Sequence, residues 1–182
     1  LPADLPGAPL VKERRALFPA SFDPMTNGHM DIIGRVLRLG VFEEFVLAVG
    51  KNPEKKSLFS VEERVDLLRE VVADLQNGHT LRVTVLDGLM VDFAREMGAT
   101  AIIRGVRSPR DFEYEAEMGF LNHHLAPDIE MLFLIADPRY AFLSSTLVKQ
   151  VAQMGGNLEG LVPTAVIDRL RSRVAGEASP QA

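Results

Sequence analysis

Hydrophobic residues along this chain fall into two kinds of segment that alternate. Short apolar runs rich in β-branched and aromatic residues are separated by longer segments in which apolar residues recur every three or four positions. The first pattern is typical of buried strands, and the second of helices with one apolar face. The pattern therefore predicts strands at residues 15–19, 44–49, 82–86, 101–104 and 131–135.

Helices are predicted between these strands and after the last of them. The clearest helix start is at Ser60 and Glu63, whose spacing is that of a capping box, in which each side chain accepts a hydrogen bond from the other residue's backbone N–H. The predicted helices comprise residues 29–39, 61–75, 90–97, 111–125, 145–154 and 163–174.

This order of strands and helices predicts an α/β fold, with an open, doubly wound, five-stranded parallel sheet joined by right-handed crossovers. Ligands of such sheets bind outside the carboxyl ends of the strands, so any site is expected in the loops that follow the strands. Residues 14–175 are predicted to form a single domain. Residues 1–13, which are rich in proline, are expected to be a loose leader, and the polar residues 176–182 a flexible tail.

Composition narrows the class of partner. The chain has 182 residues, a net charge of -5 and a pI near 5.4, so it lacks the basic field that would hold a nucleic acid or an anionic membrane. Cysteine is absent, which excludes disulfides, thiolate catalysis and Cys-ligated zinc. No apolar run approaches the roughly 18–20 residues that span a bilayer. We expect a cytoplasmic protein with a small, locally bound ligand.

The loop after the first predicted strand, residues 20–29 (ASFDPMTNGH), ends in the first turn of a predicted helix. A helix start favours phosphate, because its backbone N–H groups are unpaired and the helix dipole is positive there. An imidazole at His29 can donate to a phosphate oxygen whose charge grows during nucleotidyl transfer. Alternatively, Thr26 or Asn27 only caps the helix and His29 is a neutral surface or packing residue. For one histidine alone this alternative is favoured.

Later loops place cations at the same predicted edge of the sheet. Lys51, Lys55 and Lys56 follow the second strand, although Lys51 and Lys56 are more simply interpreted as surface lysines. Arg104 and Arg107 follow the fourth strand and are expected to be separated by a glycine turn. Guanidinium groups suit bidentate contacts with phosphate.

The loop after the fifth predicted strand, residues 140–146 (YAFLSST), ends in three consecutive hydroxyl residues that open a helix. Capping a helix needs only one of them, so a phosphate bound at this helix start explains the surplus better. Each loop is a weak signal alone. Together they bring a histidine, lysines, two arginines and a hydroxyl-rich helix start to one edge of one sheet.

In this arrangement the chain resembles the HxGH nucleotidyltransferase superfamily, whose T-x-G-H form is present at residues 26–29. It is more specifically similar to phosphopantetheine adenylyltransferase, with which it shares five motifs in order. They are S-F-D-P-x-T-x-G-H from residue 21, a K-K loop at 55–56, I-R-G-x-R from 103, D-F-E-Y-E from 111 and S-S-T-x-x-K from 144. The resemblance covers about residues 15–173 and implies a sheet of the Rossmann-like nucleotidyltransferase type.

The resemblance implies transfer of AMP from ATP to 4′-phosphopantetheine, which gives dephospho-coenzyme A and pyrophosphate in coenzyme A biosynthesis. It also implies a homohexamer and allows feedback inhibition by coenzyme A. The implied acceptor contacts are Ser21, Lys55, Met90 and Arg104, and the implied catalytic residues are His29, Lys55 and Arg104, with His29 stabilising the transition state. The implied ATP contacts are Ser21, Phe22, His29, Gly105, Val106, Arg107, Glu115, Tyr140, Ala141, Phe142, Leu143, Ser144, Ser145 and Thr146.

One of these positions has an alternative interpretation, and three others depart from the family pattern. Glu115 has the equally good interpretation of a carboxylate near a helix start that complements the helix dipole. Ala20 stands where the family usually has Gly, Ser21 replaces a frequent Thr, and His123 stands where Arg or Lys is common. Ala20 requires an ordinary extended or right-handed backbone.

The predicted chemistry is direct in-line attack by the acceptor phosphate on the α-phosphorus of ATP, because no nucleophile paired with a base is evident. Lys55 and Arg104 are expected to hold the attacking phosphate. His29, Arg107 and Ser145 are expected to support the pentavalent phosphorus and the leaving group. No metal-ligand pattern such as HExxH is present, so Mg²⁺ is expected to arrive with ATP.

Two other functions remain as alternatives. A nicotinamide or nicotinate mononucleotide adenylyltransferase tends to carry I-S-S-T-x-I-R, whereas Leu147, Val148 and Lys149 follow Thr146 here. A non-catalytic sensor of adenine nucleotide or coenzyme A would not need the intact set of cations. A classical dehydrogenase is disfavoured because no G-x-G-x-x-G follows the first strand.

Overall fold

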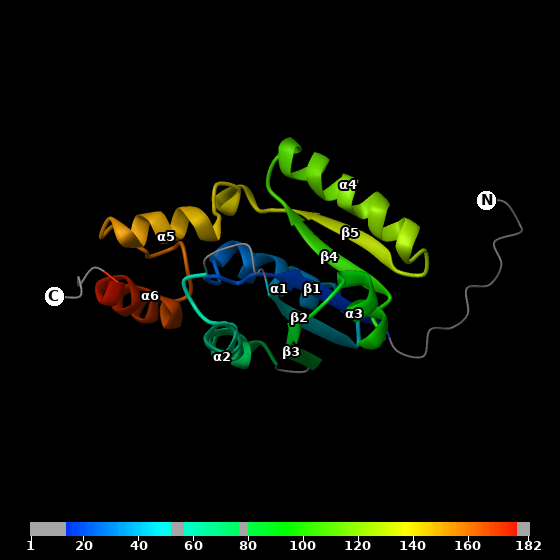
Figure 1. Cartoon of the computed structure of the whole chain (residues 1–182), viewed down its shortest axis with the longest axis horizontal. Coiled ribbons are helices and arrows are strands. Elements are labelled where there is room, and N and C mark those ends of the chain that lie inside the picture. Colours follow the sequence, from blue (N-terminus) through cyan, green and yellow to red (C-terminus); the bar gives the residue numbers. More distant parts are fainter. Residues whose placement is uncertain (1–13, 52–56, 77–79, 178–182) are drawn as a thin grey trace, which may run out of the picture.

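The computed structural model describes residues 14–51, 57–76 and 80–177. Its five strands form one parallel sheet, as predicted, and the structure shows their order to be β3-β2-β1-β4-β5 (Figure 1). The strands are β1 (Arg15–Ala20), β2 (Glu44–Gly50), β3 (Thr80–Leu86), β4 (Ala101–Val106) and β5 (Glu130–Ile135). Strand order reverses between β1 and β4, and an α/β sheet of this kind binds ligands at that reversal.

All six predicted helices are present, with boundaries shifted by a few residues. The second ends earlier than predicted and continues as a 3₁₀ helix, and the last includes two residues of the predicted tail. The predicted leader, residues 1–13, lies outside the described residues. The helices are α1 (Asn27–Leu39), α2 (Val61–Val72), η1 (Ala73–Gln76), α3 (Met90–Glu96), α4 (Pro109–Leu125), η2 (Pro138–Tyr140), α5 (Ser145–Gln153) and α6 (Thr164–Glu177).

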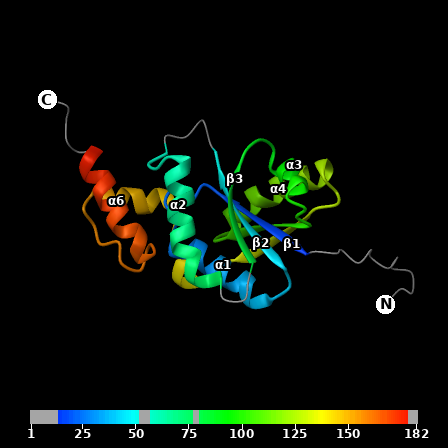
Figure 2. The same cartoon turned by 90° about the horizontal axis from the view of Figure 1, so that it is seen from below.

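Side chains of the central strands alternate between two apolar clusters, one on each face of the sheet. In β2, Phe45 and Leu47 pack in the cluster that includes buried residues of α1, α2, α5 and α6. Val46 and Ala48 pack in the other cluster, which includes buried residues of α3. Both faces are covered (Figure 2), so the sheet is doubly wound as predicted.

Local signals explain where α1 and α2 begin. The capping box predicted at Ser60 and Glu63 is present, with the Ser60 backbone N–H donating to Glu63 Oε2 at 2.8 Å. A second capping box opens α1, where Thr26 is the cap and His29 takes the place that Glu usually has. It places His29 just beyond the carboxyl end of β1.

Candidate active site

A cavity of about 280 Å³ lies at the carboxyl ends of β1 and β4, where the strand order reverses. Its walls come from the end of β1, the start of α1, the end of β4, α4 and the segment that opens α5. Most of the predicted site residues line it. They are Ser21, His29, Arg104, Gly105, Arg107, Glu115, Tyr140, Leu143, Ser144, Ser145 and Thr146.

Other predicted site residues lie elsewhere or outside the described residues. Phe22 is buried beneath the cavity, with its ring centroid 5.1 Å from that of His29. Met90 is partly buried and packs in the apolar cluster on the α3 face of the sheet. Val106, Ala141 and Phe142 adjoin residues of the cavity wall without lining it. Lys55 lies outside the described residues.

His29 is held by the first turn of its own helix. The Thr26 backbone N–H donates to His29 Nδ1 at 3.0 Å, so Nδ1 carries no proton and the ring proton lies on Nε2. Burial and the positive charges of Arg107 and Arg104 lower the pKa of His29 from 6.5 to about 4. At neutral pH the imidazole is therefore a neutral hydrogen-bond donor in the cavity wall.

This state predicts how His29 titrates in the ligand-free protein. Since the pKa is lowered, proton uptake is expected only as the pH falls towards about 4, and the ring stays neutral from about pH 8 to about pH 5. Nuclear magnetic resonance of the imidazole nitrogens measures this, with the signal assigned by its loss in His29→Ala. A midpoint near 6.5 for that signal contradicts the prediction.

Arg104 is oriented by three hydrogen bonds. Its Nε and Nη2 donate to the two carboxylate oxygens of Glu115, both at 2.7 Å, and its Nη1 donates to the Pro19 carbonyl oxygen at 2.7 Å. In the ligand-free protein Glu115 thus fixes the Arg104 guanidinium at the cavity wall, and its contact with nucleotide stays a prediction.

Arg107 is anchored beside it, and the expected glycine turn between the two arginines is wrong. Strand β4 continues through Gly105 to Val106. A Cβ atom on Gly105 would lie 3.3 Å from Ile32 Cγ1, so glycine here allows α1 to pack closely over β4. Arg107 Nε donates to Asp111 at 2.7 Å and Nη1 to the Leu143 carbonyl oxygen at 2.7 Å.

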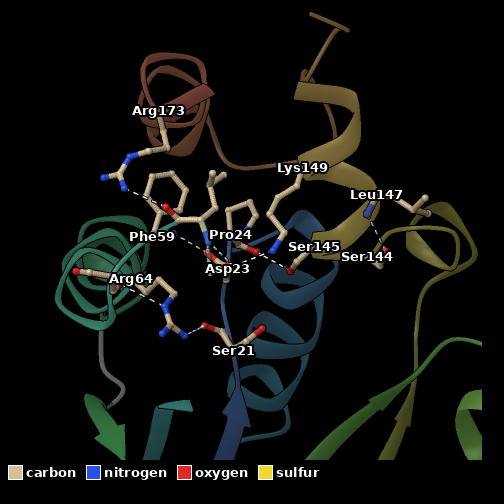
Figure 3. Close-up of polar contacts among 12 residues, drawn as sticks. Ser21, Asp23, Pro24, Phe59, Arg64, Ser144, Ser145, Leu147, Lys149 and Arg173 are labelled. Carbon is tan, nitrogen blue, oxygen red and sulfur yellow. Dashed lines mark hydrogen bonds and ion pairs between the residues drawn. The ribbon is translucent and has the colours of Figure 1, made fainter. Parts of the chain in front are cut away.

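Two of the hydroxyl groups at the start of α5 form hydrogen bonds within the protein, one more than capping requires. Ser144 is the helix cap and accepts a hydrogen bond from the Leu147 backbone N–H at 3.1 Å. Ser145 Oγ donates to the Pro24 carbonyl oxygen at 2.8 Å (Figure 3). In the ligand-free protein the Ser145 hydroxyl is therefore not surplus, and its contact with phosphate stays a prediction. The helix start still faces the cavity through these residues and Thr146.

Comparison with known proteins places this chain in a family. Residues 17–151 match the cytidylyltransferase-like family model. The chain is 46% identical over 160 residues to the phosphopantetheine adenylyltransferase of Caldanaerobacter subterraneus subsp. tengcongensis, covering 88% of this chain and 97% of that protein. It is 48% identical over 163 residues to that of Frankia casuarinae, covering 89% and 99%. The chain belongs to the phosphopantetheine adenylyltransferase family.

A second, more open cavity of about 860 Å³ lies beside the first, at the carboxyl ends of β2 and β3. Its walls include residues 57–61 before and at the start of α2, residues 86–88 after β3, and Arg173 of α6. Lys51 lines it and pairs with Asp87 at 2.5 Å. The two cavities open on the same edge of the sheet, at the carboxyl ends of the strands.

Arg64 was missed in the sequence analysis. It lines the second cavity and contacts Ser21, which lines the first. Arg64 is 3% exposed, and its Nη1 donates to the carbonyl oxygen of Ser21 at 2.7 Å (Figure 3). The same Nη1 donates to the carbonyl oxygen of Gly50 at 3.0 Å. It thus joins the ends of β1 and β2 to α2. The available signal was its position three residues after Val61, on the apolar stripe of the helix, where a charged residue needs a partner.

Two departures from the family pattern have simple structural outcomes. Ala20 is the last residue of β1, so its backbone is extended as expected. His123 is exposed on α4 and does not line either cavity. Neither position changes the set of cations and hydroxyl groups around the first cavity.

The described residues contain neither a metal-ligand cluster nor a membrane-spanning helix. In residues 14–51, 57–76 and 80–177, no group of three or more His, Asp or Glu side chains is arranged to hold a metal ion. Over the same part of the chain, no helix has the length and apolar character needed to cross a membrane.

Proposed function

We propose that this chain transfers AMP from ATP to 4′-phosphopantetheine, producing dephospho-coenzyme A and pyrophosphate in coenzyme A biosynthesis. The carrying observation is the first cavity, where a neutral His29, the guanidinium groups of Arg104 and Arg107, and the start of α5 converge in a chain of this family. These are donors and positive charges suited to a triphosphate.

The reaction is a direct displacement. An oxygen of the acceptor phosphate attacks the α-phosphorus of ATP, the bond to the bridging oxygen of the β-phosphate breaks, and pyrophosphate leaves with that electron pair. His29 Nε2–H donates to the α-phosphate as its negative charge grows. Arg104 holds the attacking phosphate, and Arg107 with the α5 start holds the rest of the triphosphate. Lys55, outside the described residues, is assigned to the attacking phosphate by resemblance alone.

The acceptor extends from the first cavity into the second. The phosphate of 4′-phosphopantetheine lies near Ser21 and Arg104, and its pantetheine arm follows the carboxyl ends of β2 and β3. The backbone of Ser21 supports this path, because Arg64 binds its carbonyl oxygen while also lining the second cavity. Met90 begins α3 directly after that wall and is the proposed contact for the arm.

Mg²⁺ enters as part of the nucleotide substrate. Glu115, the acidic residue that lines the first cavity, is occupied by Arg104, so the described residues form no cage for the ion there. Mg²⁺ is commonly held by substrate phosphates with few protein ligands. The ion would neutralise phosphate charge, while this chain's residues orient the phosphates.

A homohexamer in the cytoplasm is the proposed state of the enzyme, with coenzyme A as a feedback inhibitor. Helix α4 lies next to β5, which is an edge strand of the sheet (Figure 1). Exposed apolar side chains on both support an interface between copies. Phe120 is 77% and Ile135 76% exposed. Sedimentation equilibrium tests this assembly. A chain without cysteine fits a reducing compartment.

An acceptor comparison tests the function. The purified protein is incubated with ATP and Mg²⁺ and with 4′-phosphopantetheine, nicotinamide mononucleotide or glycerol 3-phosphate in parallel, and pyrophosphate is measured. Of the three acceptors, only 4′-phosphopantetheine is expected to give pyrophosphate release. Faster release with nicotinamide mononucleotide would reassign the acceptor, and ATP binding without pyrophosphate release would make the protein a sensor.

A further inference from the structure

Asp23 is a buried carboxylate with no role in the mechanism above. It is 4% exposed and lines neither cavity. Its oxygens accept hydrogen bonds from the backbone N–H groups of Leu58 at 3.0 Å and Phe59 at 2.9 Å, and from Lys149 Nζ at 2.9 Å (Figure 3). A buried charge is costly unless it is paired, and these three donors come from two segments far from Asp23 in the sequence.

One of these contacts leads to the first cavity. Lys149 lies on α5 one turn after Ser145, whose hydroxyl group donates to the carbonyl oxygen of Pro24, the residue after Asp23. Helix α5 packs chiefly against α6, which lies with it beyond the carboxyl ends of the strands (Figure 1). The polar contacts to residues 23–24 therefore join α5 near its start to the loop that leads to His29.

The other two contacts lead to the second cavity. Leu58 and Phe59 both line it, directly before the cap of α2. Arg173 of α6 donates to the Leu58 carbonyl oxygen at 3.0 Å, and its guanidinium lies 5.2 Å from the centre of the Phe59 ring. Asp23 thus binds the N–H side of this segment while α6 binds its carbonyl side.

We propose that Asp23 is a positioning residue that sets the two substrate cavities relative to each other. Through Lys149 it positions the start of α5, which lines the first cavity. Through the Leu58 and Phe59 N–H groups it positions a wall of the second cavity, where the acceptor's pantetheine arm is proposed to bind. In-line transfer depends on this spacing, because misplacing reacting groups by about 1 Å can cost about 10²-fold in rate. The inference rests on the proposed function.

Michaelis constants for the two substrates separate the effect of the Lys149 contact from that of the Leu58 and Phe59 contacts. Lys149→Met keeps the side-chain length without the charge, and is expected to raise the KM for ATP about tenfold while the KM for 4′-phosphopantetheine changes less than about twofold. Asp23→Asn replaces an acceptor with a donor that faces a backbone N–H, so both KM values are expected to rise.

The double variant distinguishes positioning from a direct contact of Lys149 with ATP. If Lys149 acts through Asp23, the KM for ATP in Asp23→Asn/Lys149→Met stays within about twofold of that in Lys149→Met. If Asp23→Asn alone also raises the KM for ATP about tenfold, independent actions would multiply to about a hundredfold. Asp128→Asn is the control, since it breaks an ion pair to Arg95 of 2.6 Å at the opposite edge of the sheet and should keep both parental KM values.

Circular dichroism melting shows which variants are folded. If Asp23→Asn is not folded, the KM values of Lys149→Met alone decide the test. A folded Lys149→Met enzyme with the parental KM for ATP, or with equal rises in both KM values, overturns the inference. Multiplying effects in the double variant do so as well. A parental protein that releases no pyrophosphate overturns the proposed function itself, and the positioning role with it.

Discussion

His29→Ala is expected to lower kcat by about 10²–10³ while the fold is kept, because the variant loses a donor that acts on charge developing in the transition state. The native ring is already neutral and held by the Thr26 N–H, so the enzyme spends no energy orienting it during the reaction. Steady-state pyrophosphate release at saturating ATP and acceptor measures the effect.

The same substitution also removes one half of a capping box, so a control for stability is needed. Glu63→Ala removes the equivalent half at the start of α2, where Glu63 accepts the Ser60 N–H, together with an ion pair to Arg173. His29→Ala is expected to lose about 1 kcal/mol of stability in denaturant unfolding, and Glu63→Ala at least as much. Only His29→Ala should lose the rate. Parental turnover in a folded His29→Ala protein would remove His29 from the mechanism.

Arg104→Ala is expected to raise the KM for 4′-phosphopantetheine by about 10–100-fold and the KM for ATP by much less. The guanidinium is lost from the acceptor phosphate, and Glu115 is left as an unpaired carboxylate in the cavity wall, where it repels the same phosphate. Initial rates measured against each substrate separately give both constants.

Two companion variants divide this effect into its parts. Arg104→Ala/Glu115→Gln removes the repulsion and should recover part of the lost acceptor affinity. Arg104→Lys keeps a charge but loses the forked pair with Glu115, so it is expected to fall between the parental enzyme and Arg104→Ala. Equal rises in the KM values for acceptor and ATP in Arg104→Ala would contradict the assignment of Arg104 to the acceptor phosphate.

The candidate site was predictable to the extent that it depends on strand ends. Parallel strands deliver all their carboxyl ends to one edge, so loops distant in sequence meet there whatever their detailed conformation. That is why His29, Arg104, Arg107 and the α5 start were expected together and line one cavity. The path of the chain within each loop was less predictable, as the missed continuation of β4 through Gly105 shows.

Pairings between distant residues could not be predicted, because no local pattern encodes them. Ser145 looked like a phosphate ligand by its neighbours, yet its hydroxyl donates to Pro24. Arg64 was not singled out from the sequence, yet it is buried and binds two strand ends. In both cases the partner lies more than ten residues away in the sequence.

By itself, the sequence determined the order of strands and helices, the capping box at Ser60 and the edge of the sheet where ligands bind, because hydrophobic period and capping act over a few neighbouring residues. Only the tertiary structure decided which polar groups reach that edge unpaired and which are used to hold it together. Asp23 and Lys149 meet across 126 residues of chain, and such a contact forms only after the sheet and its helices have packed.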